Sequence, residues 1–343
     1  MKKLGVIVVG GAGAVARSNH IPCWLKNPHT NVLALVDLNE ERLKATCQSF
    51  GIKRYYTSLE EALDKEREAE IVDLATPPKV HYSHAILSLK EGKHVIMEKP
   101  MASSLEECEE IINLARKKHL KVSLFHVYKG YPVVWKIKEL IAKGELGENI
   151  FISFMDSWID EGLQSWWKGI KTAIFHEFAV HEIYVSLYWL EEVKDVKVIV
   201  HSKDEDGMIK DATVFLYGNR GISEITIFKT RREIGYETRI FGSKGKMIIP
   251  PFPTGVFKWL EMPEQRNFRK IISKEFKRLV PPFGMIREGI KYLLLREKVL
   301  AHYTILSNFV RSILYNDELI VPPEEGLETI RVLKKIDELC KDV

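Results

Sequence analysis

The chain has 343 residues, of which 45% are hydrophobic and 29% are charged, and its formal net charge is +4. This length predicts two globular domains, because single cores stop growing at roughly 250–300 residues. The small, evenly spread positive charge gives no reason to expect a nucleic-acid partner. No run reaches the ~18–20 apolar residues that span a bilayer, so we expect no membrane insertion.

The cysteines and the N-terminal sequence indicate the cellular compartment in which the protein is expected. The four cysteines stand apart from one another, with no pair at the spacing of a metal or redox motif: Cys23, Cys47, Cys108 and Cys340. Lys2 and Lys3, followed by an apolar run and Ala14-Val15-Ala16, imitate a signal peptide. Glycines interrupt that run and have a better explanation below, so we expect a cytoplasmic protein without structural disulfides.

The first 127 residues alternate between short apolar runs and longer amphipathic segments. The expected strands are Leu4–Val9, Asn31–Val36, Ile71–Ala75, His94–Met97 and Lys121–Phe125. The expected helices are Ala14–Lys26, Glu40–Phe50, Leu59–Lys65, Tyr82–Lys90 and Leu105–His119. Continuous apolar strands are typical of parallel sheets covered on both faces, and the alternation implies right-handed crossovers. We therefore predict an α/β fold for residues 1–127, a Rossmann domain with a doubly wound parallel sheet.

From residue 128 the pattern changes to neighbouring strands. A helix is expected over Pro132–Lys143, a strand over Ile150–Met155 and a long helix over Thr172–Leu190. Four strands then follow in succession: Val196–His201, Ala212–Tyr217, Ile222–Lys229 and Tyr236–Phe241. Residues 128–343 are thus predicted to form an α+β domain with an open, mostly antiparallel sheet. We expect the final helices to pack back on the first domain.

A glycine-rich turn follows the first strand and opens the first helix, which is the setting of the dinucleotide-binding fingerprint G-x-G-x-x-G/A. Gly11 would permit the tight turn, and Gly13 would let the backbone approach a pyrophosphate at the helix N-terminus. The predicted cofactor-binding residues here are Gly11, Ala12, Gly13, Ala14 and Val15. The alternative is a plain strand-to-helix turn without a ligand.

Asp37 ends the second strand, where a carboxylate accepts hydrogen bonds from the adenosine ribose and repels a 2′-phosphate. Leu38 and Asn39 follow it and supply no Arg for such a phosphate. Asp37 could also cap the next helix, which is compatible with cofactor binding. We therefore expect NAD as the cofactor, with NADP as the less favoured alternative.

Three segments resemble the Gfo/Idh/MocA oxidoreductases, the family of glucose–fructose oxidoreductase and inositol dehydrogenase. They are the fingerprint GAGAVARSNH from Gly11, the segment ATPPKVH from Ala75, and EGKHVIMEKP from Glu91. The last segment is close to the most specific signature of the family. The resemblance covers the N-terminal domain in order and spacing, and the helix–strand pattern of the second half agrees with it.

The resemblance implies roles for residues in the first domain. Lys99 would contact both the nicotinamide and the substrate hydroxyl, and a cis bond would join it to Pro100. A lysine that ends a buried parallel strand also lies at the strand edge where ligands bind, and its ammonium could stabilise a developing alkoxide. The other cofactor contacts would be Thr76, Pro77, His81 and Glu98, and His126 would contact substrate.

The second domain of such relatives carries D-x-G-x-H, which here reads Glu177-Phe178-Ala179-Val180-His181. Glu177 and His181 are four residues apart, so in an α-helix they share one face, and His181 could accept a proton. We predict Lys99, His181 and Glu177 as catalytic residues. Tyr184 stands where relatives place a further acid. His176 and His181 are five residues apart, about 140° around a helix, so we expect no metal there.

A Trp-rich loop from Asp156 to Lys171 supplies flat aromatic side chains beside hydrogen-bonding groups. Such a surface suits a sugar ring, and it equally suits a subunit interface. As substrate-binding residues we predict Lys99, His126, Trp158, Trp166, Trp167 and His181.

Together these patterns predict an NAD-dependent dehydrogenase that acts on a secondary hydroxyl of a sugar, sugar derivative or cyclitol. Two alternatives remain: a hydrolase or lyase that retains NAD and oxidises its substrate transiently, and a non-catalytic dinucleotide sensor. Ile222, Ile225 and Ile227 alternate with polar residues, so one face of the open sheet could be apolar. We expect that sheet to join a homodimer or homotetramer.

Overall fold

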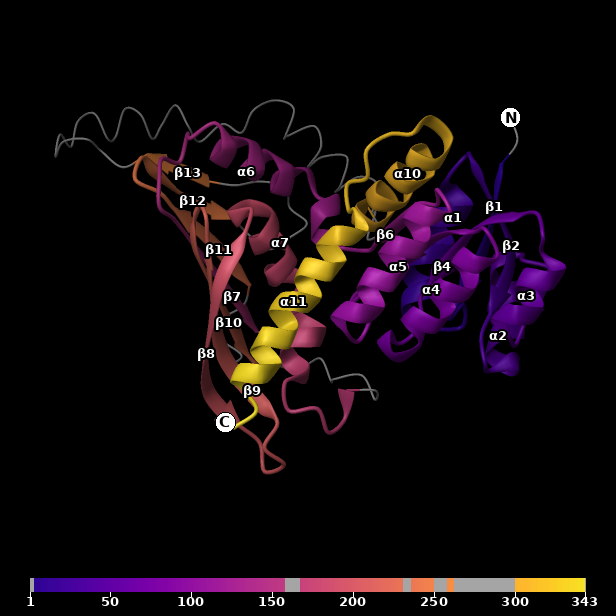
Figure 1. Ribbon diagram of the computed structural model, residues 1–343, viewed down its shortest axis with the longest axis horizontal. Helices are drawn as coiled ribbons and strands as arrows, with labels where there is room; N and C mark the ends of the chain where they lie inside the picture. Colours follow the sequence, from indigo (N-terminus) through magenta and orange to yellow (C-terminus); the bar gives the residue numbers. More distant parts are fainter. Residues whose placement is uncertain (1–2, 158–166, 231–235, 250–257, 262–299, 343) are drawn as a thin grey trace. The chain divides into compact units, whose positions relative to one another are not determined.

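The computed structural model describes residues 3–157, 167–230, 236–249, 258–261 and 300–342 (Figure 1). The chain divides into two compact units, each made of two stretches of sequence. Unit 1 comprises Met1–Gly130 and Lys298–Arg331, and unit 2 comprises Tyr131–Glu297 and Val332–Val343. The boundary in the C-terminal part falls inside one helix, α11 (Pro323–Leu339).

Unit 1 is built on a six-stranded parallel sheet in the order β3-β2-β1-β4-β5-β6. The strands are β1 (Leu4–Val9), β2 (Thr30–Val36), β3 (Arg54–Tyr56), β4 (Ala69–Leu74), β5 (His94–Met97) and β6 (Val122–Leu124). Every residue of β1 is buried, as expected for a central strand covered on both faces. Strand order reverses between β1 and β4, which confirms the predicted Rossmann topology and locates its ligand crevice.

Three helices of unit 1 begin at short polar side chains that cap them. Asn39 caps α2 (Glu40–Phe50), Ser58 caps α3 (Leu59–Lys65) and Ser104 caps α5 (Leu105–Lys117), each by accepting a backbone N–H. Such a cap contributes about 1 kcal/mol. Unit 1 also contains α4 (His81–Lys90) and α10 (Leu300–Tyr315), and α10 packs on the short 3₁₀ helix η3 (Val127–Gly130).

The first helix differs from the prediction of one α-helix over Ala14–Lys26. It consists of a π-helical segment, η1 (Ala16–His20), followed by α1 (Ile21–Lys26). Pro22 has no N–H to donate to the carbonyl of Ser18, so the regular hydrogen-bond ladder cannot continue through this point. The wider turn carries His20 into the interior, where it is fully buried.

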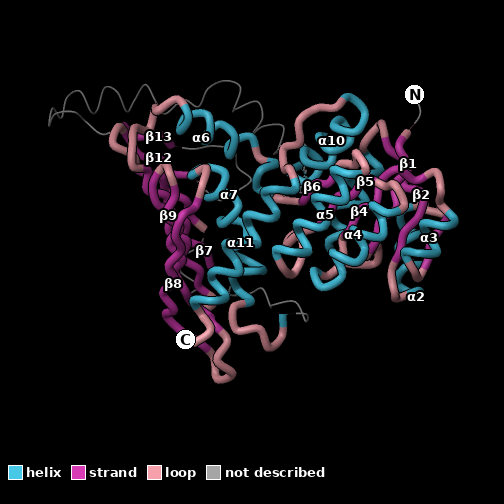
Figure 2. The backbone as a smooth tube through the Cα atoms, in the orientation of Figure 1, coloured by secondary structure: helices cyan, strands magenta, loops and turns pink. Residues whose placement is uncertain are grey.

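Unit 2 is built on a sheet whose strands are magenta in Figure 2. The sheet has seven strands in the order β13-β12-β11-β7-β10-β9-β8. Its strands are β7 (Ile150–Ser157), β8 (Val193–Lys203), β9 (Ile209–Gly218), β10 (Gly221–Phe228), β11 (Glu237–Phe241), β12 (Gly245–Ile249) and β13 (Lys258–Glu261). The central pair, β10 and β7, is parallel, and every other pair is antiparallel. The prediction of a mostly antiparallel sheet is confirmed.

The expected long helix Thr172–Leu190 is also divided. The structure has a π-helical segment, η5 (Phe175–Ala179), and then α7 (Val180–Leu190). Hydrogen bonds in a π turn span five residues, so the α-helical face rule used to pair Glu177 with His181 does not hold at Glu177. α7 packs on β9 and β10 and also contacts α6 (Pro132–Ala142).

Burial along β10 corrects one expectation about the open face of the sheet. Ile225 and Ile227 are 0% and 1% exposed and lie on the side that α7 covers. Ile222 is three positions from Ile225 and five from Ile227, both odd numbers, so it points to the opposite side, because side chains alternate along a strand. That opposite side includes Phe151 and Phe241, whose rings lie 6.2 Å apart.

Among the described residues, every helix is too short or too polar to cross a bilayer.

Candidate active site

The glycine turn after β1 is shaped by close backbone contacts. Gly10 has a φ of +78°, and a Cβ on it would lie 2.4 Å from the carbonyl oxygen of Ala75. A Cβ on Gly13 would lie 3.0 Å from the carbonyl oxygen of Gly10. Ala14 and Val15 are exposed. The turn therefore presents open backbone at the start of the first helix, and it fits a dinucleotide pyrophosphate.

Asp37 faces this turn from the end of β2. Its Oδ2 accepts a hydrogen bond from the Ala12 backbone N–H at 3.0 Å, and its Oδ1 accepts one from Asn39. Arg42, on the first turn of α2, donates from Nη2 to the Ala12 carbonyl at 3.1 Å. Arg42 was not predicted from the sequence, because it stands five positions after Asp37, yet it lies beside the same turn.

His81 bridges two loops at the carboxyl ends of the strands. Its Nε2 lies 2.7 Å from the Thr76 carbonyl and its Nδ1 lies 2.8 Å from the Pro100 carbonyl. The ring is fully buried, and burial lowers its pKa. The Lys99–Pro100 bond is cis, as predicted. His81 thus ties the segment with Thr76 and Pro77 to the segment with Lys99.

Glu98 points to His20, with 3.0 Å between Oε1 and Nε2. On its other side, His20 Nδ1 lies 3.0 Å from both carboxylate oxygens of Asp73. Burial alone would lower the pKa of His20, but Asp73 and then Glu98 outweigh it and raise that pKa to about 10. Burial likewise opposes ionisation of Glu98, but His20 lowers the pKa of this carboxyl to about 2.

His126 lies in a buried polar cluster at the edge of unit 1. It is 1% exposed, and its Nδ1 is 3.9 Å from Oε2 of Glu325, which is an ion-pair distance rather than a hydrogen bond. Lys129 donates to the other oxygen of Glu325 and to the Ile320 carbonyl. Burial lowers the pKa of His126. The contact between Glu325 and Lys129 in this cluster joins α11 to η3.

In unit 2, Glu177 belongs to a network around η5. Its Oε2 accepts a hydrogen bond from the Trp167 indole at 2.8 Å. The Trp167 ring lies 5.2 Å from the ring of His176, whose Nε2 is 2.9 Å from Oδ1 of Asp337. Trp167 is 7% exposed. The predicted Trp158, Trp166 and Asp160 lie outside the described residues.

His181 is half-buried on the first turn of α7. Its Nδ1 lies 2.9 Å from the hydroxyl of Tyr184, and the two rings meet edge to face. In one of the two tautomers, Nδ1–H donates to Tyr184 and Nε2 keeps its lone pair. That tautomer is the one in which the imidazole can accept a proton.

Two buried carboxylates, one on α7 and one on β7, were not predicted from the sequence. Glu182 is 0% exposed and Asp156, on β7, is 3% exposed. Burial and then the charge of Glu182 raise the pKa of Tyr236 well above its ordinary value, and Asp156 adds to the effect. The signal in the sequence was a glutamate one position after His181 inside an otherwise apolar helix.

A family model described as "Oxidoreductase family, NAD-binding Rossmann fold" (GFO_IDH_MocA) matches residues 4–126. Residues 4–126 belong to the Gfo/Idh/MocA oxidoreductase family. The matched range holds the glycine turn, Asp37, His81 and Lys99, which are the residues of unit 1 described above.

The chain is similar to two curated proteins over part of its length. Oxidoreductase P35 of Formosa agariphila is 26% identical over 54% of this chain and 61% of that protein. Glucose-6-phosphate 3-dehydrogenase of Bacillus subtilis is 32% identical over 44% of this chain and 41% of that protein. Both alignments cover less than two thirds of the relative.

One solved structure shares the fold over nearly the whole chain. The WlbA dehydrogenase from Bordetella pertussis, crystallised with NADH and UDP-GlcNAcA, has a TM-score of 0.80 and covers 99% of this chain and 96% of its own. Its identity is 17%, so the likeness shows the fold. The combination of a parallel sheet in one unit and a mostly antiparallel sheet in the other therefore also occurs in a protein of known structure.

Proposed function

We propose that this protein is an NAD(H)-dependent oxidoreductase that transfers a hydride between a secondary hydroxyl carbon and the nicotinamide. The observation that carries the proposal is the glycine turn with the Asp37 carboxylate at Ala12, inside the segment that the family model matches. When bound, the cofactor supplies the hydride acceptor. A sugar, sugar derivative or cyclitol is the proposed substrate class, in line with the named relatives.

Lys99 and His181 are the proposed catalytic pair, by their resemblance to the family pattern. The Lys99 ammonium orients the reacting hydroxyl and stabilises its developing negative charge. The hydroxyl proton passes to Nε2 of His181, while the carbon gives up its hydride and becomes a carbonyl carbon. A hydrogen bond donated by Nδ1–H of His181 to the Tyr184 hydroxyl supports this role, because that tautomer leaves the Nε2 lone pair available to accept the proton.

NAD is the proposed cofactor because Asp37 carries a negative charge next to the turn. Arg42 is the feature that would oppose this preference, since a guanidinium can bind a 2′-phosphate. Four buried free thiols support a reducing compartment such as the cytoplasm.

The experiment that tests the activity is a screen of sugars, sugar phosphates, sugar nucleotides and cyclitols with NAD⁺ for NADH absorbance. A dehydrogenase gives NADH in proportion to oxidised product. Product without accumulation of NADH would instead indicate an enzyme that retains its cofactor and oxidises transiently. Failure of every such substrate to react in either direction would refute the proposal.

We also propose that the open face of the unit 2 sheet joins two copies of the chain. Exposed Ile199 and Phe241 lie on this sheet, at 50% and 37% exposure, and an apolar face of this kind favours association. Light scattering at micromolar concentration should give twice or four times the mass of one chain. A monomer, or a dimer unaffected by Ile199→Glu with Phe241→Glu, would contradict the assignment of this face.

A further inference from the structure

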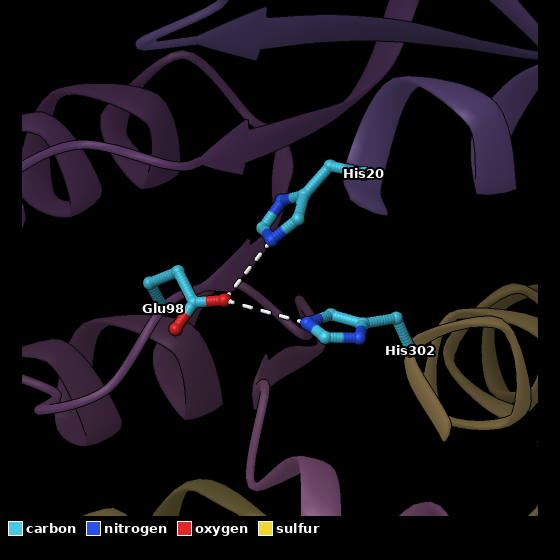
Figure 3. Close-up of side chains that lie close together, drawn as sticks. All are labelled: His20, Glu98 and His302. Atoms are coloured by element: carbon cyan, nitrogen blue, oxygen red, sulfur yellow. Dashed lines mark hydrogen bonds and ion pairs between the residues drawn. The ribbon is translucent and has the colours of Figure 1, made fainter. Parts of the chain in front are cut away.

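Three ligand-type side chains converge inside unit 1 from distant parts of the chain. His20 comes from η1, Glu98 follows β5, and His302 comes from the first turn of α10 (Figure 3). One nitrogen of each imidazole and one oxygen of the carboxylate all lie within 4.8 Å of one another. Glu98 Oε1 is 3.0 Å from Nε2 of His20 and 3.9 Å from Nε2 of His302.

These spacings suit a shared ion. Two atoms that bind one zinc ion at roughly 2.0–2.2 Å in tetrahedral geometry lie about 3.3 Å apart. The observed separations are close to that value on one side and slightly long on the other. Small side-chain rotations of Glu98 and His302 would therefore bring all three atoms to bonding distance.

His20 is also supported as metal-binding histidines usually are. Its Nδ1 is held by the Asp73 carboxylate, and Oδ2 of Asp73 accepts a further hydrogen bond from the Trp24 indole at 2.6 Å. This arrangement fixes the ring and directs Nε2 toward Glu98. A carboxylate behind a histidine is the usual outer partner of a zinc ligand, and it raises the basicity of the ring.

The surroundings call for positive charge. Asp73 is 0% exposed and the Glu98 side chain is 16% exposed, so two carboxylates flank one imidazole with little access to water. A proton on His20 supplies one positive charge between them, and a divalent cation supplies two. The Phe125 ring packs against both histidines, at 4.2 and 5.6 Å, and holds the rings toward the same point.

We propose that His20, Glu98 and His302 bind a divalent transition-metal ion. Two imidazoles and one carboxylate form a donor set that suits zinc, with a remaining position for water. The bound ion ties α10 and η1 to the turn that carries Lys99, whose backbone N–H donates to Glu98 at 3.2 Å. No metal was expected from the sequence, where only His176, His181 and the cysteines were considered as ligands; His20, Glu98 and His302 share no local motif.

The test is zinc retention by the full-length protein. Protein stripped with EDTA is incubated with zinc sulfate and desalted, its metal content is measured by mass spectrometry, and its affinity by competition with a chromophoric chelator. We expect one zinc per chain, and a visible absorption band of four-coordinate cobalt when Co²⁺ replaces it. Asp73→Asn should weaken binding by about 10- to 100-fold.

Variants assign the ligands. His302→Ala and Glu98→Gln should lose the stoichiometric zinc, and His302→Gln repeats the first change at nearly constant volume, with circular dichroism to confirm folding. His29→Ala, a histidine of the same unit outside the cluster, should retain the zinc. Equal retention by the wild type and a folded His302 variant would overturn the proposal. Absence of zinc from the wild-type protein would overturn it too, and would leave a proton on His20 as the positive charge of the cluster.

Discussion

His20 in unit 1 and His181 in unit 2 both lie in or directly after a π-helical segment, and both are held through Nδ1. Their partners differ. His20 is fully buried against the carboxylate of Asp73, whereas half-buried His181 meets the neutral hydroxyl of Tyr184. A carboxylate stabilises positive charge at the ring, and a hydroxyl orients the ring without adding charge. The difference in partners fits the two roles proposed above, with His20 suited to hold positive charge and His181 suited to transfer a proton.

The largest expected effect is on turnover and concerns His181. His181→Ala should lower kcat by roughly 10²–10⁴-fold, because a general base contributes about that much. NAD affinity should stay nearly constant, since the glycine turn and Asp37 belong to unit 1. Steady-state kinetics and calorimetric titration with NAD⁺ measure the two quantities.

Lys99→Ala should impair turnover comparably, and the double variant should lose less than the product of the two effects, because the residues act as a unit. His201→Ala is the control, since this histidine of unit 2 bonds to Thr213 on the sheet. Near-normal turnover in His181→Ala would show that His181 is not the general base, and would contradict the contrast drawn between His20 and His181.

The second effect is on stability and concerns the carboxylate behind His20. Asp73→Asn should lower the free energy of unfolding by about 3–5 kcal/mol at neutral pH, because it removes one of the two carboxylates that balance the buried charge of His20. Urea unfolding in EDTA measures this without any contribution from metal. Asp64→Asn removes an exposed ion pair with Arg67 and should cost at most about 1 kcal/mol. Equal effects of the two variants would mean that His20 is not held by charge.

A third histidine sharpens the comparison, because its Nδ1 meets a donor. The Lys121 backbone N–H donates to Nδ1 of His94 at 2.9 Å, and burial followed by the charge of Lys121 lowers the pKa of His94 to about 4. Unfolding restores the ordinary value near 6.5, so the unfolded chain binds a proton first. Stability should be complete above pH 6.5 and fall toward pH 4 by about 1–3 kcal/mol.

Urea unfolding at several pH values measures that loss. His94→Gln keeps an acceptor for the Lys121 N–H and cannot titrate, so its stability should depend less on pH in this window. His29→Gln keeps the number of histidines equal and should behave as the wild type does. The same pH dependence in both variants would contradict the assignment to His94.

The smallest effect is expected at the partner of His181. Tyr184→Phe removes one hydrogen bond worth about 1 kcal/mol, which corresponds to a loss of roughly fivefold in kcat/KM. Without this acceptor the imidazolium is less favoured, so the acidic limb of the pH–rate profile should move to lower pH. Tyr188→Phe on the same helix is the matched control. An unchanged profile in Tyr184→Phe would show that the hydroxyl does not tune His181.

Local sequence patterns predicted most of the fold of unit 1. The bounds of β1, β5, α2 and α3 agree with the expectation, because continuous apolar runs and capping residues are local signals. The short edge strand β3 was missed, since Arg54–Tyr56 has only three residues and no buried side chain. Both π-helical segments were missed because helix periodicity does not distinguish hydrogen bonds over four residues from those over five.

The residues of the candidate site also fall into those that local sequence patterns predict and those that they do not. The glycine turn, Asp37 and Lys99 stand next to strand ends, so their neighbourhood follows from the strand pattern. His302 could not be associated with His20 and Glu98 from sequence, because the contact is made only when α10 packs on unit 1. Arg42 could have been predicted from the sequence, because it lies on the first turn of the helix after Asp37, and that turn faces the glycine turn.

Binding of NADH and NADPH to the purified protein tests the central claim most directly. Fluorescence titration should give one NADH per chain, with weaker binding of NADPH. Asp37→Ala should reduce the difference in affinity between NADH and NADPH. Arg42→Ala should increase that difference by weakening the binding of NADPH further. Tighter binding of NADPH by the unmutated protein would contradict the proposed cofactor, and no binding of either dinucleotide would contradict the proposed function itself.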